Sequence, residues 1–247
     1  MTLNVVIPMA GRGSRFSKVG YTVPKPLIEV DGKPLIQIVI DNLKLEAKYI
    51  FLVLKEHNEK YKLNELLPSL TAPNPCEIVE VDQVTEGAAC TVLLAKNLIN
   101  TDDELLIANS DQWVWWSAQD FIDYMRASEA DGGIVTFIAY ENKWSYAKIV
   151  NYKITHVAEK NPISEHATVG IYYFARGKEF VEAAEQMIDK NIRVNNEFYV
   201  CPVYNEIINS GKIIKPYPIP MMCGLGTPED LNEFLNSKQK IYYALKK

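Results

Sequence analysis

The sequence predicts an α/β fold with a mainly parallel, mixed central sheet. Short continuous apolar runs recur along the first half of the chain, as expected of strands that are buried on both faces. Amphipathic segments separate these runs, and such alternation is typical of strand–helix–strand units. We expect strands at 3–9, 49–54, 76–83, 104–112 and 132–140, and helices at 34–46, 58–70, 87–99 and 117–130.

Local signals mark where some of these elements begin. Pro34 suits the first position of the helix at 34–46, because a proline there gives up no needed hydrogen bond. Ser117 is a suitable N-cap for the helix at 117–130.

The second half of the chain changes character. Its first strands are short, and we expect them to be antiparallel and to form a β-rich insertion over the ligand crevice. Gly211 is expected to end one helix, and Thr227 to cap the last one. Since no flexible linker or repeat interrupts the sequence, we expect one domain over residues 1–247. The expected strands lie within 146–161, 165–175 and 212–219, and the expected helices at 177–190, 195–211 and 227–247.

Composition narrows the classes of function. The net charge of −5 argues against a nucleic-acid partner, which calls for a basic surface. The four cysteines have no C-x-x-C spacing, so neither a zinc site nor a disulfide framework is expected. We expect no membrane association, because no apolar run approaches the ~20 residues of a spanning helix. The N-terminus shows no basic leader or cleavage pattern, and we expect a cytoplasmic protein.

Three polar loops follow predicted strands, at 9–26, 83–87 and 109–113. In sheets of this kind ligands bind beyond the carboxyl ends of the strands. We therefore expect the three loops to surround one crevice.

The first of these loops suits a phosphate. Gly11 and Gly13 let the backbone approach a ligand closely, and the backbone N–H groups of such loops bind anions. Arg12 and Arg15 add positive charge in a geometry that matches phosphate oxygens. The dinucleotide pattern G-x-G-x-x-G is excluded because position 16 is phenylalanine, and the G-K-[ST] of a Walker loop is absent.

Lys25 lies between two prolines, in Pro24-Lys25-Pro26. Proline restricts its own backbone and that of the residue before it. A preset backbone lowers the entropy that a lysine loses when it binds a ligand. We therefore read Lys25 together with the glycine loop as part of one anion site.

The joint pattern "AGRGSRF…PKPLIEVDGKPLI" resembles the signature of nucleotidyltransferases that make nucleotide-activated sugars. The resemblance extends through most of the chain and includes a capsule-type cytidylyltransferase branch. It implies a Rossmann-like three-layer sandwich, with residues 1–140 as the nucleotide-binding half and 141–247 as the acceptor-binding half.

For the nucleotide, the resemblance implies contacts from the glycine loop, from the "VDQVTEG" segment that reads the base, and from an Mg²⁺-binding aspartate in "NSDQ". Magnesium suits such a site because it takes few protein ligands and keeps phosphate oxygens and water. The implied residues are Ala10, Gly11, Gly13, Ser14, Arg15, Lys25, Gln83, Gly87 and Asp111, with Asp111 as the metal ligand.

For the acceptor, the family uses a Y-G segment, an E-K pair and a following glycine strand. Here the segment is Tyr146-Ala147, with alanine in place of glycine. Glu159 would contact acceptor hydroxyls, Lys160 the acceptor phosphate, and Gly170 would line the pocket.

The last motif departs from the family pattern. "CGLGTPEDL" resembles D-x-G-T-P-E-D-L, but the second metal aspartate is replaced by Gly224. Three interpretations remain open. Another side chain, for example Glu197, could replace the aspartate as second metal ligand, or Asp111 could hold the metal together with phosphates and water alone. In the third, the acceptor is not the usual hexose. Three tryptophans directly follow Asp111 and either pack in the core or alter the acceptor pocket: Trp113, Trp115 and Trp116.

The resemblance implies a reaction that needs no general base. The acceptor is a phosphate, already ionised at neutral pH, that attacks the α-phosphorus of a pyrimidine nucleoside triphosphate and releases pyrophosphate. Arg15, Lys25 and Lys160 would supply the charge stabilisation, with Mg²⁺ at Asp111. The product would be a precursor of a surface or capsular polysaccharide.

Open alternatives are a cytidylyltransferase for a phospho-alcohol or phospho-amino acid, a glycosyltransferase of related fold, and a non-catalytic nucleotide-binding protein. A homo-oligomer is also possible.

Overall fold

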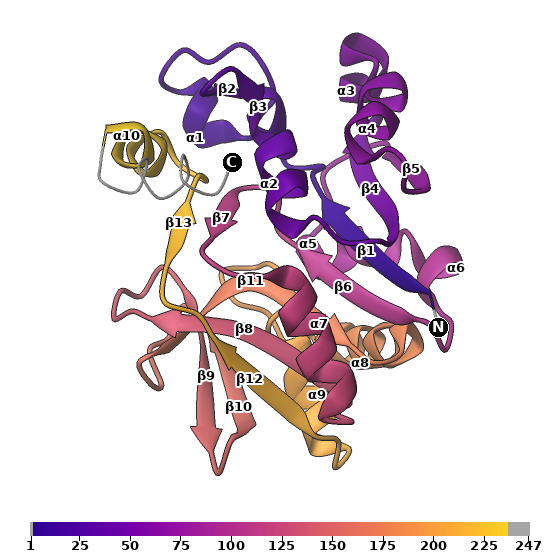
Figure 1. Cartoon of the computed structure of the whole chain (residues 1–247), viewed down its shortest axis with the longest axis vertical. Coiled ribbons are helices and arrows are strands. Elements are labelled where there is room, and N and C mark those ends of the chain that lie inside the picture. Colours follow the sequence, from indigo (N-terminus) through magenta and orange to yellow (C-terminus); the bar gives the residue numbers. More distant parts are fainter. Residues whose placement is uncertain (1, 237–247) are drawn as a thin grey trace.

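The computed structural model describes residues 2–236, and Figure 1 shows the arrangement of the elements. Strands and helices alternate along the first half, as predicted. In order, this half contains β1 (Leu3–Pro8), α1 (Ser14–Ser17), the 3₁₀ helix η1 (Lys25–Leu27), β2 (Glu29–Val30), β3 (Lys33–Pro34), α2 (Leu35–Leu43), β4 (Lys48–Leu54), α3 (Lys55–Tyr61), α4 (Leu63–Thr71), β5 (Cys76–Val81), α5 (Ala88–Leu93), α6 (Lys96–Ile99), β6 (Glu104–Ala108), β7 (Gln112–Val114), α7 (Ala118–Ala127) and β8 (Gly132–Ile138).

The second half begins with three strands and then turns mainly helical. It contains β9 (Ser145–Val150), β10 (Lys153–Glu159), β11 (His166–Phe174), α8 (Gly177–Asp189), α9 (Val203–Asn209), β12 (Ile214–Pro218), β13 (Met222–Gly224) and α10 (Pro228–Asn236).

One mixed sheet runs through both halves of the chain. Within residues 2–236 it has nine strands, in the order β10-β9-β11-β6-β1-β4-β5, with β8 between β11 and β12. The pairs β1–β4, β1–β6 and β4–β5 are parallel, whereas β11 is antiparallel to β6, β8 and β9. The prediction of an α/β fold with a mainly parallel, mixed central sheet is confirmed.

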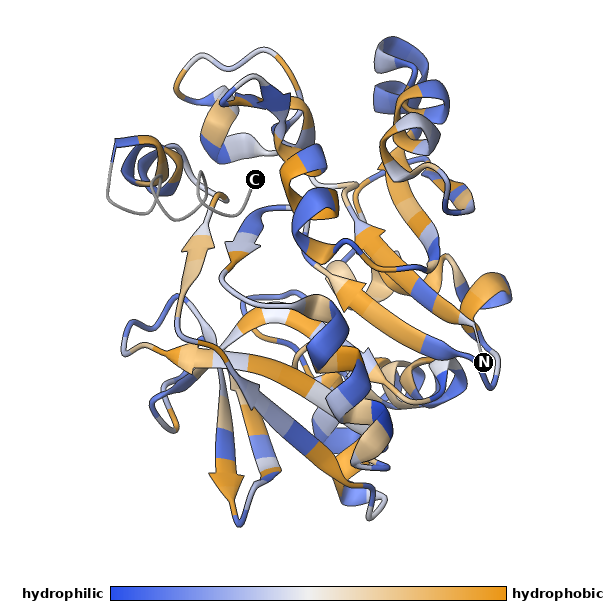
Figure 2. Cartoon of the chain, viewed as in Figure 1, coloured by the Kyte–Doolittle hydropathy of each residue, from blue (hydrophilic) through white to orange (hydrophobic). Residues whose placement is uncertain are grey.

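Alternation of side chains along the central strands places the sheet between two helical layers. On β1, Val5 and Ile7 pack into the core on one face, with α2, α4 and α7, and Val6 packs on the opposite face with α5, α8 and α9. Figure 2 shows β1, β4 and β6 as mostly hydrophobic. Burial on both faces explains why these strands read as continuous apolar runs.

Several predicted helices begin or break differently in the structure. The helix expected at 34–46 begins at Leu35, and Pro34 is the residue directly before it. The expected helix at 58–70 is two helices separated by Lys62, whose left-handed backbone ends α3. The expected helix at 87–99 is likewise divided into α5 and α6.

Other boundaries are as expected. Ser117 caps α7, because its hydroxyl accepts a hydrogen bond from Asp120 N at 3.2 Å. Thr227 caps α10 in the same way, with Asp230 N at 3.0 Å. The remainder of the predicted terminal helix, 237–247, lies outside the described residues.

The predicted helix at 195–211 is wrong over its first half, since helix α9 begins only at Val203. Asn195 and Asn196 have left-handed backbones, which asparagine tolerates and a helix does not. Phe198 uses its backbone N–H and C=O in hydrogen bonds to the segment at 86–89. The segment at 195–202 is therefore a loop attached to another part of the molecule.

The strands at 145–159 also differ from the expected insertion. β9 and β10 form an antiparallel hairpin, and β9 joins the main sheet where Tyr146 pairs with Ala167 of β11. The hairpin extends the sheet at its edge.

A buried charge links three elements at the start of β6. The Glu104 carboxylate, which is 5% exposed, accepts three hydrogen bonds from Arg126 of α7 and one at 2.6 Å from Tyr173 of β11. Burial alone would raise the pKa of Glu104, but these hydrogen bonds and the charge of Arg126 outweigh it and lower the pKa below the ordinary 4.5.

We therefore expect Glu104 to stabilise the fold above about pH 4.5, and this contribution to be lost as the pH falls through the lowered pKa. Glu104→Gln should cost about 1.5–3 kcal/mol near pH 7, the range for hydrogen bonds to charged groups, and the difference from wild type should shrink in acid. Urea unfolding across the pH range measures this. Glu185→Gln, in the exposed pair with Lys96, is the control and should cost under about 1 kcal/mol. A pH-independent difference between Glu104→Gln and wild type would contradict the assignment.

Candidate active site

Two of the predicted loops meet in an ion pair beyond the carboxyl ends of β1 and β6. Lys25 Nζ lies 2.7 Å from Asp111 Oδ2, and the two side chains are 22% and 24% exposed. Figure 1 shows β1 and β6 pointing toward the side of the molecule where α1, β7 and β13 lie. Lys25 and Asp111, which were predicted as parts of one site, are therefore in direct contact.

The glycine loop packs against this pair. Gly13 has a left-handed backbone, with φ of 60°, and a Cβ on it would lie 3.1 Å from the Lys25 Cβ. Gly11 is exposed, and a Cβ there would meet nothing within 4 Å. Arg15 and Ser14 are exposed on α1, whereas Ala10 is buried at the end of β1. The loop thus leaves its backbone and the Arg15 guanidinium open to a ligand.

A second turn holds Asp111 from the other side. Leu225 N donates to Asp111 O at 2.8 Å. A Cβ on Gly226 would lie only 2.6 Å from Asp111 Oδ2, a distance that carbon side chains do not show. The position of the carboxylate therefore depends on the absence of a side chain at Gly226.

The position of the missing aspartate lies beside this turn. Gly224 pairs with Gln112 between β13 and β7. A Cβ on Gly224 would lie 3.6 Å from Asp230 Oδ2 and 3.6 Å from the Trp144 ring, which is ordinary contact. An indole ring and a carboxylate from α10 therefore border the space that a side chain at 224 would enter.

The donor set at Asp111 fits Mg²⁺ better than a metal that needs a full protein shell. Among residues 2–236, no group of three or more His, Cys, Asp or Glu side chains gathers as a metal site. Asp111 already holds one cation, the Lys25 ammonium. Magnesium binds through one or two carboxylates and completes its shell with phosphate oxygens and water, so the residues present fit it.

The predicted base-reading segment is shaped by a close backbone contact. Gln83 is exposed just after β5. Gly87 has φ of 138°, and a Cβ on it would lie 2.4 Å from the backbone oxygen of Phe198. This glycine therefore lets the loop at 195–202 pack against the start of α5.

The predicted acceptor pair lies at the end of β10, with Glu159 as its last residue and Lys160 directly after it. Glu159 is 9% exposed and accepts a hydrogen bond from Ser145 Oγ, and burial raises the pKa of this carboxyl. Lys160 has a left-handed backbone, with φ of 53°. Its ammonium donates to the Tyr199 hydroxyl at 2.5 Å and lies 4.6 Å from the centre of that ring.

Three other predicted acceptor residues belong to the scaffold. The Tyr146 side chain is fully buried and donates its hydroxyl hydrogen to Glu141 O at 2.6 Å, and Ala147 is fully buried in the core. Gly170 packs against Asn109, whose side-chain nitrogen would lie 2.1 Å from a Cβ at that position. Tyr146 and Ala147 are therefore core residues, and Gly170 packs against the segment that carries Asp111.

Sequence reasoning missed Tyr199, Gly226 and Asn109. Pro202 could have revealed the loop that carries Tyr199, though not the tyrosine's contact, because proline inside a predicted helix favours a break there. Glu197, considered as a substitute metal ligand, is instead hydrogen-bonded to Tyr199.

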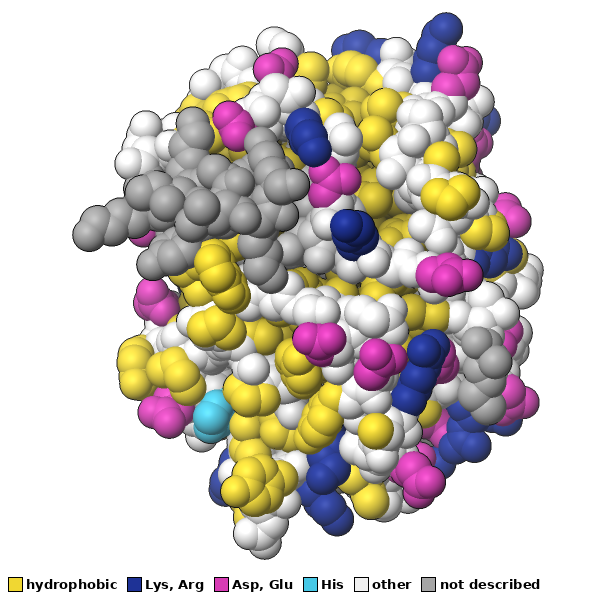
Figure 3. Space-filling view, viewed as in Figure 1, with side chains coloured by type: hydrophobic (Ala, Val, Ile, Leu, Met, Phe, Trp, Pro, Cys, Tyr) yellow, Lys and Arg dark blue, Asp and Glu magenta, His cyan; other side chains and the backbone are white. Residues whose placement is uncertain are grey.

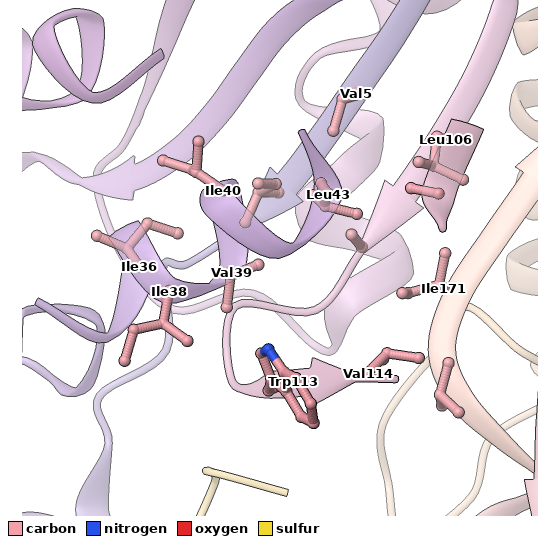
Figure 4. Close-up of a cluster of buried hydrophobic side chains, with 14 of the residues drawn as sticks. Val5, Ile36, Ile38, Val39, Ile40, Leu43, Leu106, Trp113, Val114 and Ile171 are labelled. Carbon is pink, nitrogen blue, oxygen red and sulfur yellow. The ribbon is translucent and has the colours of Figure 1, made fainter. Parts of the chain in front are cut away.

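The tryptophans after Asp111 pack mainly in the core. Trp113 is 2% and Trp116 is 7% exposed, and Trp113 contacts Trp115 and Phe234 ring to ring. Figure 4 shows the Trp113 ring beside Val39 of α2.

Figure 3 shows lysine and arginine interspersed with acidic side chains over the face in view. Of the helices within residues 2–236, none combines the length and apolar character needed to span a bilayer.

The fold brings the glycine loop and the Lys25–Asp111 pair together at one edge of an α/β sheet. Residues 4–204 match the family model described as "Nucleotidyl transferase", and the chain belongs to that family. It is therefore an enzyme of the nucleotidyltransferase class.

Three known proteins illustrate the range of similarity. The bifunctional protein GlmU of Methanocaldococcus jannaschii is 27% identical over 177 residues, which are 70% of this chain and 40% of the relative, so the chain spans less than half the length of that curated relative. The nucleoside-diphosphate-sugar pyrophosphorylase of Vibrio cholerae RC9 superposes with a TM-score of 0.81 at 28% identity, covering 94% of this chain and 100% of that one. The inositol-1-phosphate CTP transferase of T. maritima, at 16% identity and a TM-score of 0.74, shares the fold.

The contact between Gly226 and Asp111 yields a prediction. Gly226→Ala should lower turnover about 10- to 100-fold, because it would displace by a fraction of an ångström the Asp111 carboxylate, which is predicted to take part in the reaction. Gly224→Ala is the matched control, since its Cβ meets nothing closer than 3.6 Å. Steady-state rates and thermal midpoints of both variants measure this. Equal turnover in the two variants would refute the role of Gly226.

Proposed function

We propose that the chain joins a pyrimidine nucleoside triphosphate to a sugar phosphate, or to a similar small phosphorylated acceptor, and releases pyrophosphate. The observation that carries the proposal is the Lys25–Asp111 pair beside the glycine loop, in a chain of the nucleotidyl transferase family. The similarity to a nucleoside-diphosphate-sugar pyrophosphorylase over almost the whole chain supports a sugar-phosphate acceptor.

The proposed chemistry needs charge and position more than proton transfer. The acceptor phosphate is already ionised at neutral pH, so it attacks the α-phosphorus in line without a general base. Arg15 and the glycine-loop backbone would bind the triphosphate, Lys25 would neutralise the leaving pyrophosphate, and Lys160 would hold the attacking phosphate. A magnesium ion held by Asp111 would neutralise phosphate charge.

The other predicted residues divide between binding of the nucleotide and binding of the acceptor. Residues 1–140 would bind the nucleotide, with Gln83 and Gly87 reading the base, and residues 141–247 would bind the acceptor, all within one domain. Glu159 would contact acceptor hydroxyls, while Tyr146, Ala147 and Gly170 would support that pocket. The product would serve as a cytoplasmic precursor for a surface or capsular polysaccharide.

A second candidate is a cytidylyltransferase with a non-sugar acceptor, such as a phospho-alcohol or phospho-amino acid. The absence of a carboxylate at Gly224 favours it, together with the Trp144 ring that borders that position at 3.6 Å. The face of an aromatic ring attracts an ammonium group, so the Trp144 ring suits an acceptor that carries a positive charge.

Pyrophosphate release distinguishes these reactions. CTP, UTP, dTTP and ATP would be assayed separately against glucose 1-phosphate, glucosamine 1-phosphate, phosphocholine, phosphoethanolamine and phosphoserine. Release with a pyrimidine nucleotide and a sugar phosphate supports the first candidate, and release with CTP and a non-sugar phosphate supports the second. No release with any pair rejects both.

The ion pair gives a second prediction. Lys25→Ala and Asp111→Ala should each lower turnover by at least ~100-fold, because each removes a charge that stabilises the transition state. Lys33→Ala is the control, since Lys33 pairs with Asp41 through an exposed contact on β3 and should change turnover less than about 2-fold. Near-normal turnover in either of the first two variants would remove that residue from the mechanism.

A further inference from the structure

The loop before α9 carries a tyrosine that lies between the predicted nucleotide and acceptor residues. Its backbone is held by the segment after β5: Phe198 N donates to Glu86 O at 2.8 Å, and Ala89 N donates to Phe198 O at 3.0 Å. Arg193 pairs with Glu86 at 2.5 Å and lies 4.0 Å from the centre of the Phe198 ring. The position of Tyr199 is therefore set by fixed backbone contacts.

The Tyr199 phenol interacts with charged groups from three segments of the chain. Lys160 Nζ donates to its hydroxyl at 2.5 Å. Glu197 accepts a hydrogen bond from the same hydroxyl, and Arg15 of α1 lies near enough for its charge to act on the phenol. Burial, and then the bond to Glu197, raises the pKa of Tyr199 well above its usual value. A phenol that stays neutral accepts from Lys160 and donates to Glu197 at the same time.

The backbone and the ammonium group of Lys160 are both held in place by contacts. Its left-handed backbone is anchored by a hydrogen bond from its own N–H to Trp144 O at 3.0 Å. Unusual backbone conformations that the surroundings hold in place cluster at functional sites. The bond to Tyr199 occupies one of the three N–H donors of the ammonium and leaves two for a phosphate. A lysine fixed in this way loses less entropy when the phosphate binds.

We propose that Tyr199 is a positioning residue for the acceptor: its hydroxyl, held by Glu197, orients the Lys160 ammonium toward the phosphate that attacks the nucleotide. The inference rests on the proposed function, because it assumes that Lys160 binds that phosphate. No role in catalysis is required of the phenol itself.

Tyr199→Phe tests the proposal because it removes the hydroxyl and keeps the ring under the ammonium. We expect the KM for the acceptor to rise at least ~10-fold, since the ammonium loses its preset position, while the KM for the nucleoside triphosphate stays within about 2-fold. Glu197→Gln keeps an acceptor oxygen for the phenol and should raise the acceptor KM by a smaller factor, about 3-fold. Initial rates of pyrophosphate release would be measured with the best acceptor from the panel above.

Tyr49→Phe is the matched control. The Tyr49 hydroxyl is buried and, like that of Tyr199, hydrogen-bonded; its partner is Leu45, and it lies on β4 outside the candidate site. Both KM values should stay within about 2-fold in this variant. An unchanged acceptor KM in Tyr199→Phe, or an equal rise in both KM values, would overturn the proposal, because a purely structural defect has no reason to affect one substrate alone.

Crystal structures separate failure of this inference from failure of the proposed function. Wild type and Tyr199→Phe would each be crystallised with inorganic phosphate as the probe. A Lys160 ammonium that contacts Tyr199 in wild type and is displaced in the variant supports the positioning role even if no substrate pair releases pyrophosphate. A Lys160 side chain in the same place in both structures overturns that role, whatever the pyrophosphate assay gives.

Discussion

The candidate site depends on the ion pair in which Lys25 balances the negative charge of Asp111. Asp111 and Lys25 are 86 residues apart in sequence, and their ion pair joins the loop after β6 to the loop after β1. A partly buried carboxylate is costly without a cation or hydrogen-bond donors, so this pair favours the arrangement in which the two loops meet. The turn at Leu225 and Gly226 packs on the same residue. Three distant segments therefore gather around a single carboxylate.

Much of the fold could be predicted because burial leaves a periodic trace in sequence. The apolar run at 49–54 predicted β4 almost to the residue, since both faces of that strand are covered. The segment at 195–202 could not be predicted in the same way. Its apolar residues suggested a helix, but the backbone of Phe198 forms hydrogen bonds with residues more than a hundred positions away in the chain. Local pattern carries no information on a partner so distant.

The candidate site, like the fold, could be predicted from the sequence only in part. Lys25 and Asp111 were predictable because a lysine between prolines and a carboxylate at a strand end are local features with a chemical meaning. Gly87 was also predicted, yet its contact with the Phe198 backbone became visible only in three dimensions. Tyr199 was not predicted, because nothing local distinguishes a tyrosine that holds a lysine from one that fills a core. Contacts between segments decide such roles, and a single sequence does not record them.

The continuity of the sheet has a consequence for how the molecule can move. β11, from the second half of the chain, is hydrogen-bonded to β6 from the first half over Ile171 to Phe174. A hinge rotation between the halves would have to break this ladder, which is an opening event of the partial-unfolding kind and too costly to occur in every turnover. Adjustment to substrates is then left to the loops at the sheet edge, whose motions need not disturb the frame. The sheet is therefore a rigid frame that carries the loops. A new acceptor could be accommodated by altering the loops alone.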